Sequence, residues 1–148
     1  MSRLRRFIHL PGEQRWDLLA AVCLLAGVRL GLWLLPFRLL LRLVSRLTPQ
    51  VHAGSATRLP RASQVAWAIQ TASRYVPGTR ACLPRALAVH MLLARRGVPA
   101  RLRIGVARAE NGLLDAHAWV EDQEGVLVGN LPDLSRFTAF PLINEATR

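Results

Sequence analysis

The chain has 148 residues, of which 51% are hydrophobic and 6% aromatic, and its formal net charge is +11. This length fits one domain and excludes a multidomain enzyme, and the large apolar fraction excludes disorder over most of the chain. The two cysteines, Cys23 and Cys82, form neither a CxxC pair nor a zinc-ligand spacing, and they are too few for a disulfide scaffold. We therefore expect a reducing, cytoplasmic setting.

All twenty basic residues are arginines, and their distribution along the chain is uneven. The net charge is +6 over residues 1–50, +10 over residues 51–108 and −5 over residues 109–148. This excess of positive charge favours an anionic partner, which would be nucleic acid, an acidic membrane surface or an acidic peptide. No zinc pattern, helix-turn-helix signature or basic strand with interleaved aromatic residues accompanies the arginines, so we expect no nucleic-acid partner.

An apolar run from Leu18 to Leu35 lies close to the basic N-terminus. No small-residue cleavage site follows it, Arg29 interrupts it and Pro36 ends it near the minimum spanning length of about 18 residues, which disfavours a signal peptide and a membrane-spanning helix. After Pro36, arginines at every fourth position beside leucines predict a basic amphipathic helix. We expect both helices to pack on the rest of the domain, with contact to a membrane surface or a partner as the alternative.

Residues 48–61 are rich in Pro, Gly, Ser, Thr and Ala and predict a surface connection after the N-terminal helices. Apolar residues at helical spacing over residues 62–75 predict a third helix, which Pro77-Gly78 would end. A further helix is predicted to begin near Cys82, because Pro84 is tolerated only in a first helical turn and Gly97 suits a left-handed C-terminal cap.

Cys82 therefore lies where the helix macrodipole is positive, with Arg80 and Arg85 close in sequence. Both effects favour the thiolate over the thiol, so Cys82 is placed to act as a nucleophile. We expect Cys23, which lies within an apolar helix, to pack in the core.

After Pro99 the apolar residues recur at every second position, which predicts two strands around an Asn111-Gly112 turn. His117 lies in the second strand, on the same face as Trp119. A third short strand, residues 126–128, ends just before Asn130.

A cysteine at a helix start, a histidine on a strand and an amide or carboxylate after the next strand are the parts of a cysteine acyl-transfer site. The histidine takes the thiol proton and returns it to the leaving amine, and the third residue orients the ring, while N–H groups at the helix start supply an oxyanion hole. The alternative is an inert buried thiol beside a structural histidine. The other histidines compete poorly: His9 and His52 lie in terminal or loop sequence, and His90 lies about 12 Å along the helix axis from Cys82.

Four linked blocks of sequence resemble the transglutaminase-like leader peptidases of lasso-peptide biosynthesis. They are RACLPRALA (residues 80–88), LLARRGVPA (92–100), RIGV (103–106) and HAWVE (117–121). The resemblance is strongest over residues 62–131 and extends to the N-terminal helices with Pro36-Phe37. It implies a cysteine peptidase that cuts between the leader and the core of a lasso precursor. A small PqqD-like recognition element holds the leader, and an ATP-dependent, asparagine-synthetase-like cyclase then closes the macrolactam.

The resemblance implies that Cys82 is the nucleophile and His117 the general base. Asn130 and Asp133 are alternatives for the third member, since the family usually has an aspartate shortly after the histidine strand. Asp115 and Asp122 are expected to be exposed strand and turn residues. We assign Trp119, Arg80 and Arg85 to substrate binding, with simple packing as the alternative for Trp119, and we expect no metal and no cofactor. The chain contains no stretch that would serve as a fused recognition domain, so it resembles the stand-alone peptidase of a split system.

The expected fold is α+β. A hydrophobic helical hairpin over residues 1–50 precedes a small transglutaminase/papain-like core over residues 51–148, in which the cysteine-bearing helix packs on a short antiparallel sheet. Two other functions remain open: a transglutaminase-like acyl transferase that delivers the acyl group to an amine, and a non-enzymatic basic module that binds an anionic partner.

Overall fold

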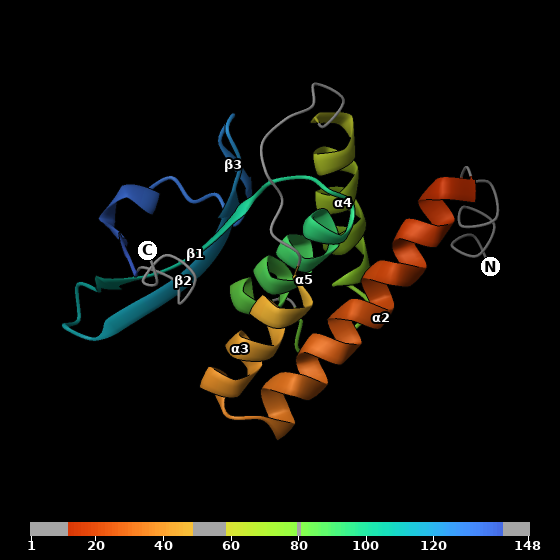
Figure 1. Ribbon diagram of the computed structural model, residues 1–148. Coiled ribbons are helices and arrows are strands. Elements are labelled where there is room, and N and C mark those ends of the chain that lie inside the picture. The colour runs from red at the N-terminus through yellow and green to blue at the C-terminus, as the bar shows by residue number, and fades with distance from the viewer. Residues whose placement is uncertain (1–11, 49–58, 80, 141–148) are drawn as a thin grey trace.

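The computed structural model describes residues 12–48, 59–79 and 81–140, and these residues form an α+β fold, as predicted. Four helices come first along the chain, and a four-stranded antiparallel sheet follows them. Figure 1 shows the helices gathered on one side of the sheet. The helices are α2 (Gly12–Leu34), α3 (Phe37–Leu47), α4 (Leu59–Ala72) and α5 (Cys82–Arg95). The strands are β1 (Arg101–Arg108), β2 (Leu114–Glu121), β3 (Val126–Val128) and β4 (Thr138–Ala139), with the 3-10 helix η1 (Leu134–Arg136) before β4.

The sheet has the order β3-β2-β1-β4. β1 and β2 form the predicted hairpin, whose turn is closed by Gly112 at φ 79° and by Asn111, which accepts a hydrogen bond from the backbone N–H of Leu113. The sequence did not predict β4, which consists of two residues and pairs with the free edge of β1 opposite Gly105 and Val106.

The hydrophobic core lies between the helices and one face of the sheet. α5 is at its centre, because α2 and α4 pack against it from one side and β2 from the other. Val65 and Ile69 of α4, Leu87 of α5 and Val120 of β2 are all fully buried there. Since α5 is enclosed in this way, the start of the helix, which carries Cys82, is held in a fixed position relative to the sheet.

α2 packs on this core along one face only. Its inner residues recur at helical spacing and are Leu18, Ala21, Leu25 and Val28. Asp17 of α2 also forms a bidentate ion pair with Arg96, just beyond the end of α5. By length and composition the segment Gln14–Leu34 could cross a membrane, and 28% of its most apolar window is buried inside the fold. The expectation that Cys23 packs in the core is wrong: its thiol is exposed, since the residue lies on the helix side opposite Ala21 and Leu25.

His90 lies on α5 with its Nδ1 buried and, among the described residues, without a hydrogen-bond partner. Burial lowers the pKa of His90 from its ordinary value of 6.5, and a hydrogen bond to the Ala100 backbone only partly opposes this effect. The folded protein therefore prefers the neutral ring, and below about pH 6.5 the unfolded chain binds a proton that the folded chain does not.

We expect the free energy of unfolding to decrease as the pH falls below about 6.5, because protonation then favours the unfolded chain. His90→Leu removes this titration, so its urea-unfolding free energy should depend less on pH than that of the wild type. Parallel pH profiles for the two proteins would contradict this role of His90.

Candidate active site

The N-terminus of α5 presents the Cys82 thiol. The residue before the helix, Ala81, has extended backbone angles and provides no side-chain cap, so Cys82 is the first helical residue, as predicted. N–H groups of an uncapped first turn are free to bind an anion, and they are the donors that an oxyanion needs. Both Cys82 and Cys23 are free thiols, and Cys82 is half-buried against the helical core.

A buried threonine fixes the turn that leads into α5. Thr79 is fully buried, and its hydroxyl oxygen lies 2.7 Å from the Val76 carbonyl oxygen and 3.3 Å from that of Ser73. Gly78 adopts φ 75° within this turn, and a Cβ at this position would lie 2.5 Å from Nε of Arg29. The Arg29 side chain of α2 therefore packs directly on the turn, three residues before Ala81.

His117 lies in the middle of β2, opposite Gly105 of β1. Its Nε2 is 2.7 Å from the carbonyl oxygen of Gly129, and a carbonyl oxygen only accepts hydrogen bonds, so Nε2 carries the proton of the neutral ring. Nδ1 is then the proton acceptor, which is the state that a general base requires. The ring stacks on Trp119 at a centroid distance of 6.1 Å and contacts Phe137 at 5.4 Å, which fixes its orientation.

Gly129 is needed for this arrangement. It has φ 86°, and a Cβ at this position would lie 2.7 Å from the Ala118 carbonyl oxygen and 2.9 Å from Cβ of Trp119. No side chain fits in that space. The sequence analysis did not identify this residue, although a glycine between a short strand and Asn130 is a recognisable signal for a special backbone conformation.

Neither candidate for the third member forms a hydrogen bond with the His117 ring. Asn130 is exposed, and Asp133 forms an ion pair of 2.6 Å with Nε of Arg136. Nη2 of Arg136 also lies 2.6 Å from Asp115, so this arginine connects η1 to β2. In the structure, the Gly129 carbonyl oxygen accepts the hydrogen bond from Nε2 of His117, which was predicted to go to a side-chain amide or carboxylate.

Replacing Asn130 or Asp133 by Ala should therefore lower kcat by less than about tenfold. In enzymes whose catalytic carboxylate sets the histidine tautomer, removing that carboxylate lowers kcat by about 10⁴. Steady-state kinetics on the cleaved substrate would measure the two variants side by side. A loss of about a thousandfold or more in either would show that its side chain orients His117 during turnover.

The elements that carry Cys82 and His117 pack together, but the two side chains are not hydrogen-bonded to each other. α5 contacts β2, and Ala118 and Val120 of β2 belong to the same core as Cys82. Because side chains alternate along a strand, His117 is directed to the face that carries Trp119 and Phe137. Figure 1 shows the start of α5 beside the β1–β2 hairpin. The His117 ring therefore lies on the face of the sheet opposite the core that contains Cys82, and the structure does not bring the two side chains together.

The residues assigned to substrate binding lie in different environments. Trp119 is only 6% exposed; its ring covers Gly105, and its Nε1–H donates a 3.3 Å hydrogen bond to Glu121, so it packs beneath His117. Arg85 is half-buried at the start of α5 and donates from Nε to the Ala81 carbonyl at 3.3 Å. Arg80 lies outside the described residues.

Two acidic residues close to His117 in sequence have structural roles. Burial opposes ionisation of the Glu121 carboxyl, but its hydrogen bonds to Arg103 and Trp119 outweigh this effect, so the pKa of Glu121 lies below its ordinary value. Asp122 accepts hydrogen bonds from the backbone N–H groups of Glu124 and Gly125 and closes the β2–β3 turn. Among the described residues, no cluster of three or more His, Cys, Asp or Glu side chains could hold a metal ion.

Comparison with protein families gives a match to the transglutaminase-like superfamily over residues 24–141. The matched segment begins within α2 and includes α3, α4, α5 and the whole sheet. The comparisons with curated proteins and with solved structures gave no match.

Proposed function

This chain belongs to the transglutaminase-like superfamily, whose chemistry is of the cysteine peptidase or acyltransferase type, and from that membership we propose that it is a cysteine peptidase that removes the leader from a lasso-peptide precursor. The observation that carries the proposal is the superfamily match, whose matched residues include both Cys82 and His117. Cys82 begins α5 at an uncapped N-terminus, and the Gly129 carbonyl holds His117 with Nδ1 as its proton acceptor.

The proposed reaction has two stages. The reaction requires the His117 ring to meet the Cys82 thiol in the substrate complex, where Nδ1 takes the thiol proton and the thiolate attacks the carbonyl carbon of the scissile amide. The Cys82 N–H at the start of α5 stabilises the oxyanion, and the imidazolium returns the proton to the leaving amine, which departs and leaves a thioester. His117 then takes a proton from water as the water oxygen attacks the thioester carbonyl, and the imidazolium returns that proton to the departing Cys82 thiolate. The new carboxylic acid loses its proton to solvent and becomes a carboxylate.

The sequence and the charge distribution support a leader peptide as the substrate. The four blocks that resemble lasso leader peptidases include both Cys82 and His117. No acidic residue occurs between Asp17 and Glu110, so the arginines of this segment have no acidic neighbours in sequence. Their positive charge would attract an acidic peptide or an acidic recognition protein. We propose a PqqD-like leader-recognition protein and an asparagine-synthetase-like cyclase as partners, and a cytoplasmic location, which the two free thiols support.

A second candidate function uses the same side chains. The superfamily match applies equally to an acyltransferase in which an amine, instead of water, attacks the Cys82 thioester. The two reactions give products of different mass, because hydrolysis adds the elements of water and transfer joins two chains.

The test is a reaction of the full chain with a lasso precursor from the same gene neighbourhood and its PqqD-like protein, with products identified by mass spectrometry. The proposal predicts separate leader and core fragments whose combined mass exceeds that of the precursor by one water, with none formed by Cys82→Ala. A conjugate mass would support the acyltransferase instead. An intact precursor, with both proteins folded and the leader bound, would contradict the peptidase function.

A further inference from the structure

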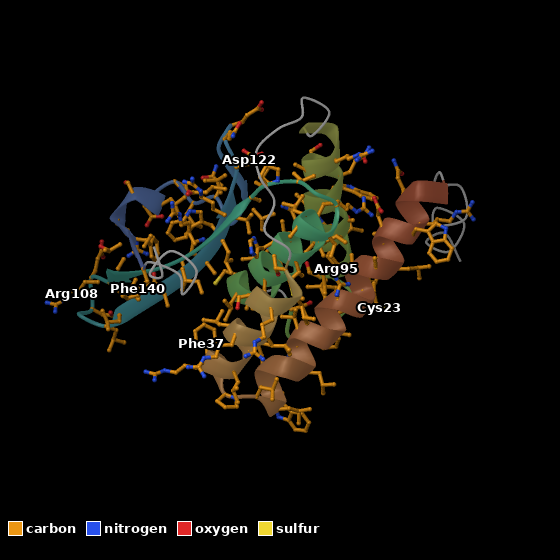
Figure 2. The ribbon with its side chains drawn as sticks, in the orientation of Figure 1. Cys23, Phe37, Arg95, Arg108, Asp122 and Phe140 are labelled. Atoms are coloured by element: carbon orange, nitrogen blue, oxygen red, sulfur yellow. The ribbon has the colours of Figure 1, made fainter. Side chains whose placement is uncertain are left out.

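The outer side of α2 and the exposed side of α3 both carry apolar residues, and we call these residues together the α2–α3 face. Outside its buried stripe, α2 carries Trp16, Leu19, Leu30, Trp33 and Leu34, and all of them are exposed. Trp16 and Trp33 are 74% and 76% exposed, respectively. A helix on the surface of a soluble domain normally has a polar outer side, whereas α2 is apolar on both sides. Figure 2 labels Cys23 on α2 and Phe37 at the start of α3, which are both part of this face.

Arginines border the apolar residues of this face. Arg38, Arg42 and Arg46 are exposed and recur at every fourth position of α3, beside the exposed Leu39 and Leu43. No acidic residue lies between Asp17 and the end of α3. A surface that complements this face must therefore combine an apolar interior with negative charges at its boundary.

We propose that the α2–α3 face docks on an anionic lipid bilayer. Acyl chains would receive the leucine and tryptophan side chains, and headgroup phosphates would meet the arginines, whose long stems can extend along the apolar surface to the headgroups. Trp16 and Trp33 are about 25 Å apart along α2, so aromatic rings anchor both ends of the helix at the interface.

The docked α2 lies in the plane of the membrane and does not cross it. Leu25 and Val28 are buried against the core, and Asp17 is ion-paired with Arg96 beyond α5. A spanning α2 would expose these inner residues and break the ion pair. The inference does not depend on the proposed peptidase activity, because it assigns to this face a location at the membrane and not a step of the reaction.

The experiment is co-sedimentation of the full chain with vesicles of phosphatidylcholine and with vesicles that also contain phosphatidylglycerol. We expect tighter binding to the anionic vesicles and weaker binding as salt is added. Replacing Arg38, Arg42 and Arg46 together by Gln should weaken binding by about a hundredfold. The matched control replaces three arginines outside the face that are also exposed, Arg61, Arg74 and Arg95, and should weaken it far less.

A second test variant and its control examine the apolar residues of the face. Trp33→Ser should weaken binding by about tenfold or more, while Trp67→Ser, which removes a 45% exposed tryptophan from α4, should have little effect. Circular dichroism confirms that each variant is folded. Equal losses in both members of either pair, or no binding to anionic vesicles, would overturn the proposal.

The reactivity of Cys23 reports on docking without any substitution in the α2–α3 face. In the Cys82→Ala protein it is the only cysteine, and its exposed thiol should react more slowly with a charged maleimide when anionic vesicles are present. Slow labelling without lipid, together with a dimer mass in solution, would assign the face to a second copy of the chain and overturn the proposal. Resistance of the bound protein to alkaline carbonate extraction would show insertion of α2 across the bilayer and would also overturn it.

Discussion

Cys82→Ala should lower kcat of precursor cleavage by at least about a thousandfold, because losing the nucleophile of a covalent mechanism leaves only the contribution of binding and of the oxyanion donors. The fold should be retained, since the side chain is small and only half-buried. Single-turnover assays with mass detection would also show whether the thioester accumulates in the wild type and is absent from the variant.

The second cysteine provides the control. Cys23→Ala removes an exposed thiol from the outer side of α2, away from the start of α5, so it should cleave the precursor in solution at the wild-type rate. If Cys82→Ala retained activity within about tenfold of the wild type, covalent catalysis by this thiol would be excluded.

Gly129→Ala should destabilise the protein and also impair catalysis. An alanine at this position would have to keep a left-handed backbone conformation, and its Cβ would lie 2.7 Å from the Ala118 carbonyl oxygen. Because both effects destabilise the folded state, we expect a loss of at least about 2 kcal/mol in the free energy of unfolding. Relief of the overlap would move the Gly129 carbonyl away from Nε2 of His117 and free the ring to change its tautomer. Urea unfolding and cleavage kinetics would measure the two effects separately.

Gly112→Ala is the matched control for this prediction. Gly112 also has a positive φ, of 79°, but a Cβ there would have no atom within 4 Å, so this variant carries the backbone cost without the steric overlap. It should lose about 1 to 2 kcal/mol of stability and no activity per folded molecule. Equal losses of stability and activity in the two variants would contradict the role of the Gly129 carbonyl.

The sequence predicted the elements that local chemistry determines. Pro84 and Gly97 define the two ends of α5, and Gly97 has the expected positive φ, of 69°. Strict alternation predicted the β1–β2 hairpin, and Asn111-Gly112 forms its turn. In each case neighbouring residues carry the whole signal, so no tertiary information was needed.

The features that the sequence did not predict depend on contacts between distant residues. β4 has only two residues and exists because Thr138 and Ala139 reach the edge of β1. The exposure of Cys23 could not be deduced from periodicity, because both sides of α2 are apolar. The acceptor for the His117 ring is a backbone carbonyl, and no side-chain type in the sequence marks such a partner.

The ion pair between Asp17 and Arg96 connects α2 to the C-terminal end of the helix whose first residue is Cys82. A ligand on the outer side of α2 and a ligand at the start of α5 therefore act on one continuous, tightly packed unit. In such a unit the two binding free energies obey thermodynamic reciprocity. If bound lipid changes the affinity for substrate by some factor, bound substrate must change the affinity for lipid by the same factor. Measuring the coupling in one direction therefore gives its value in the other.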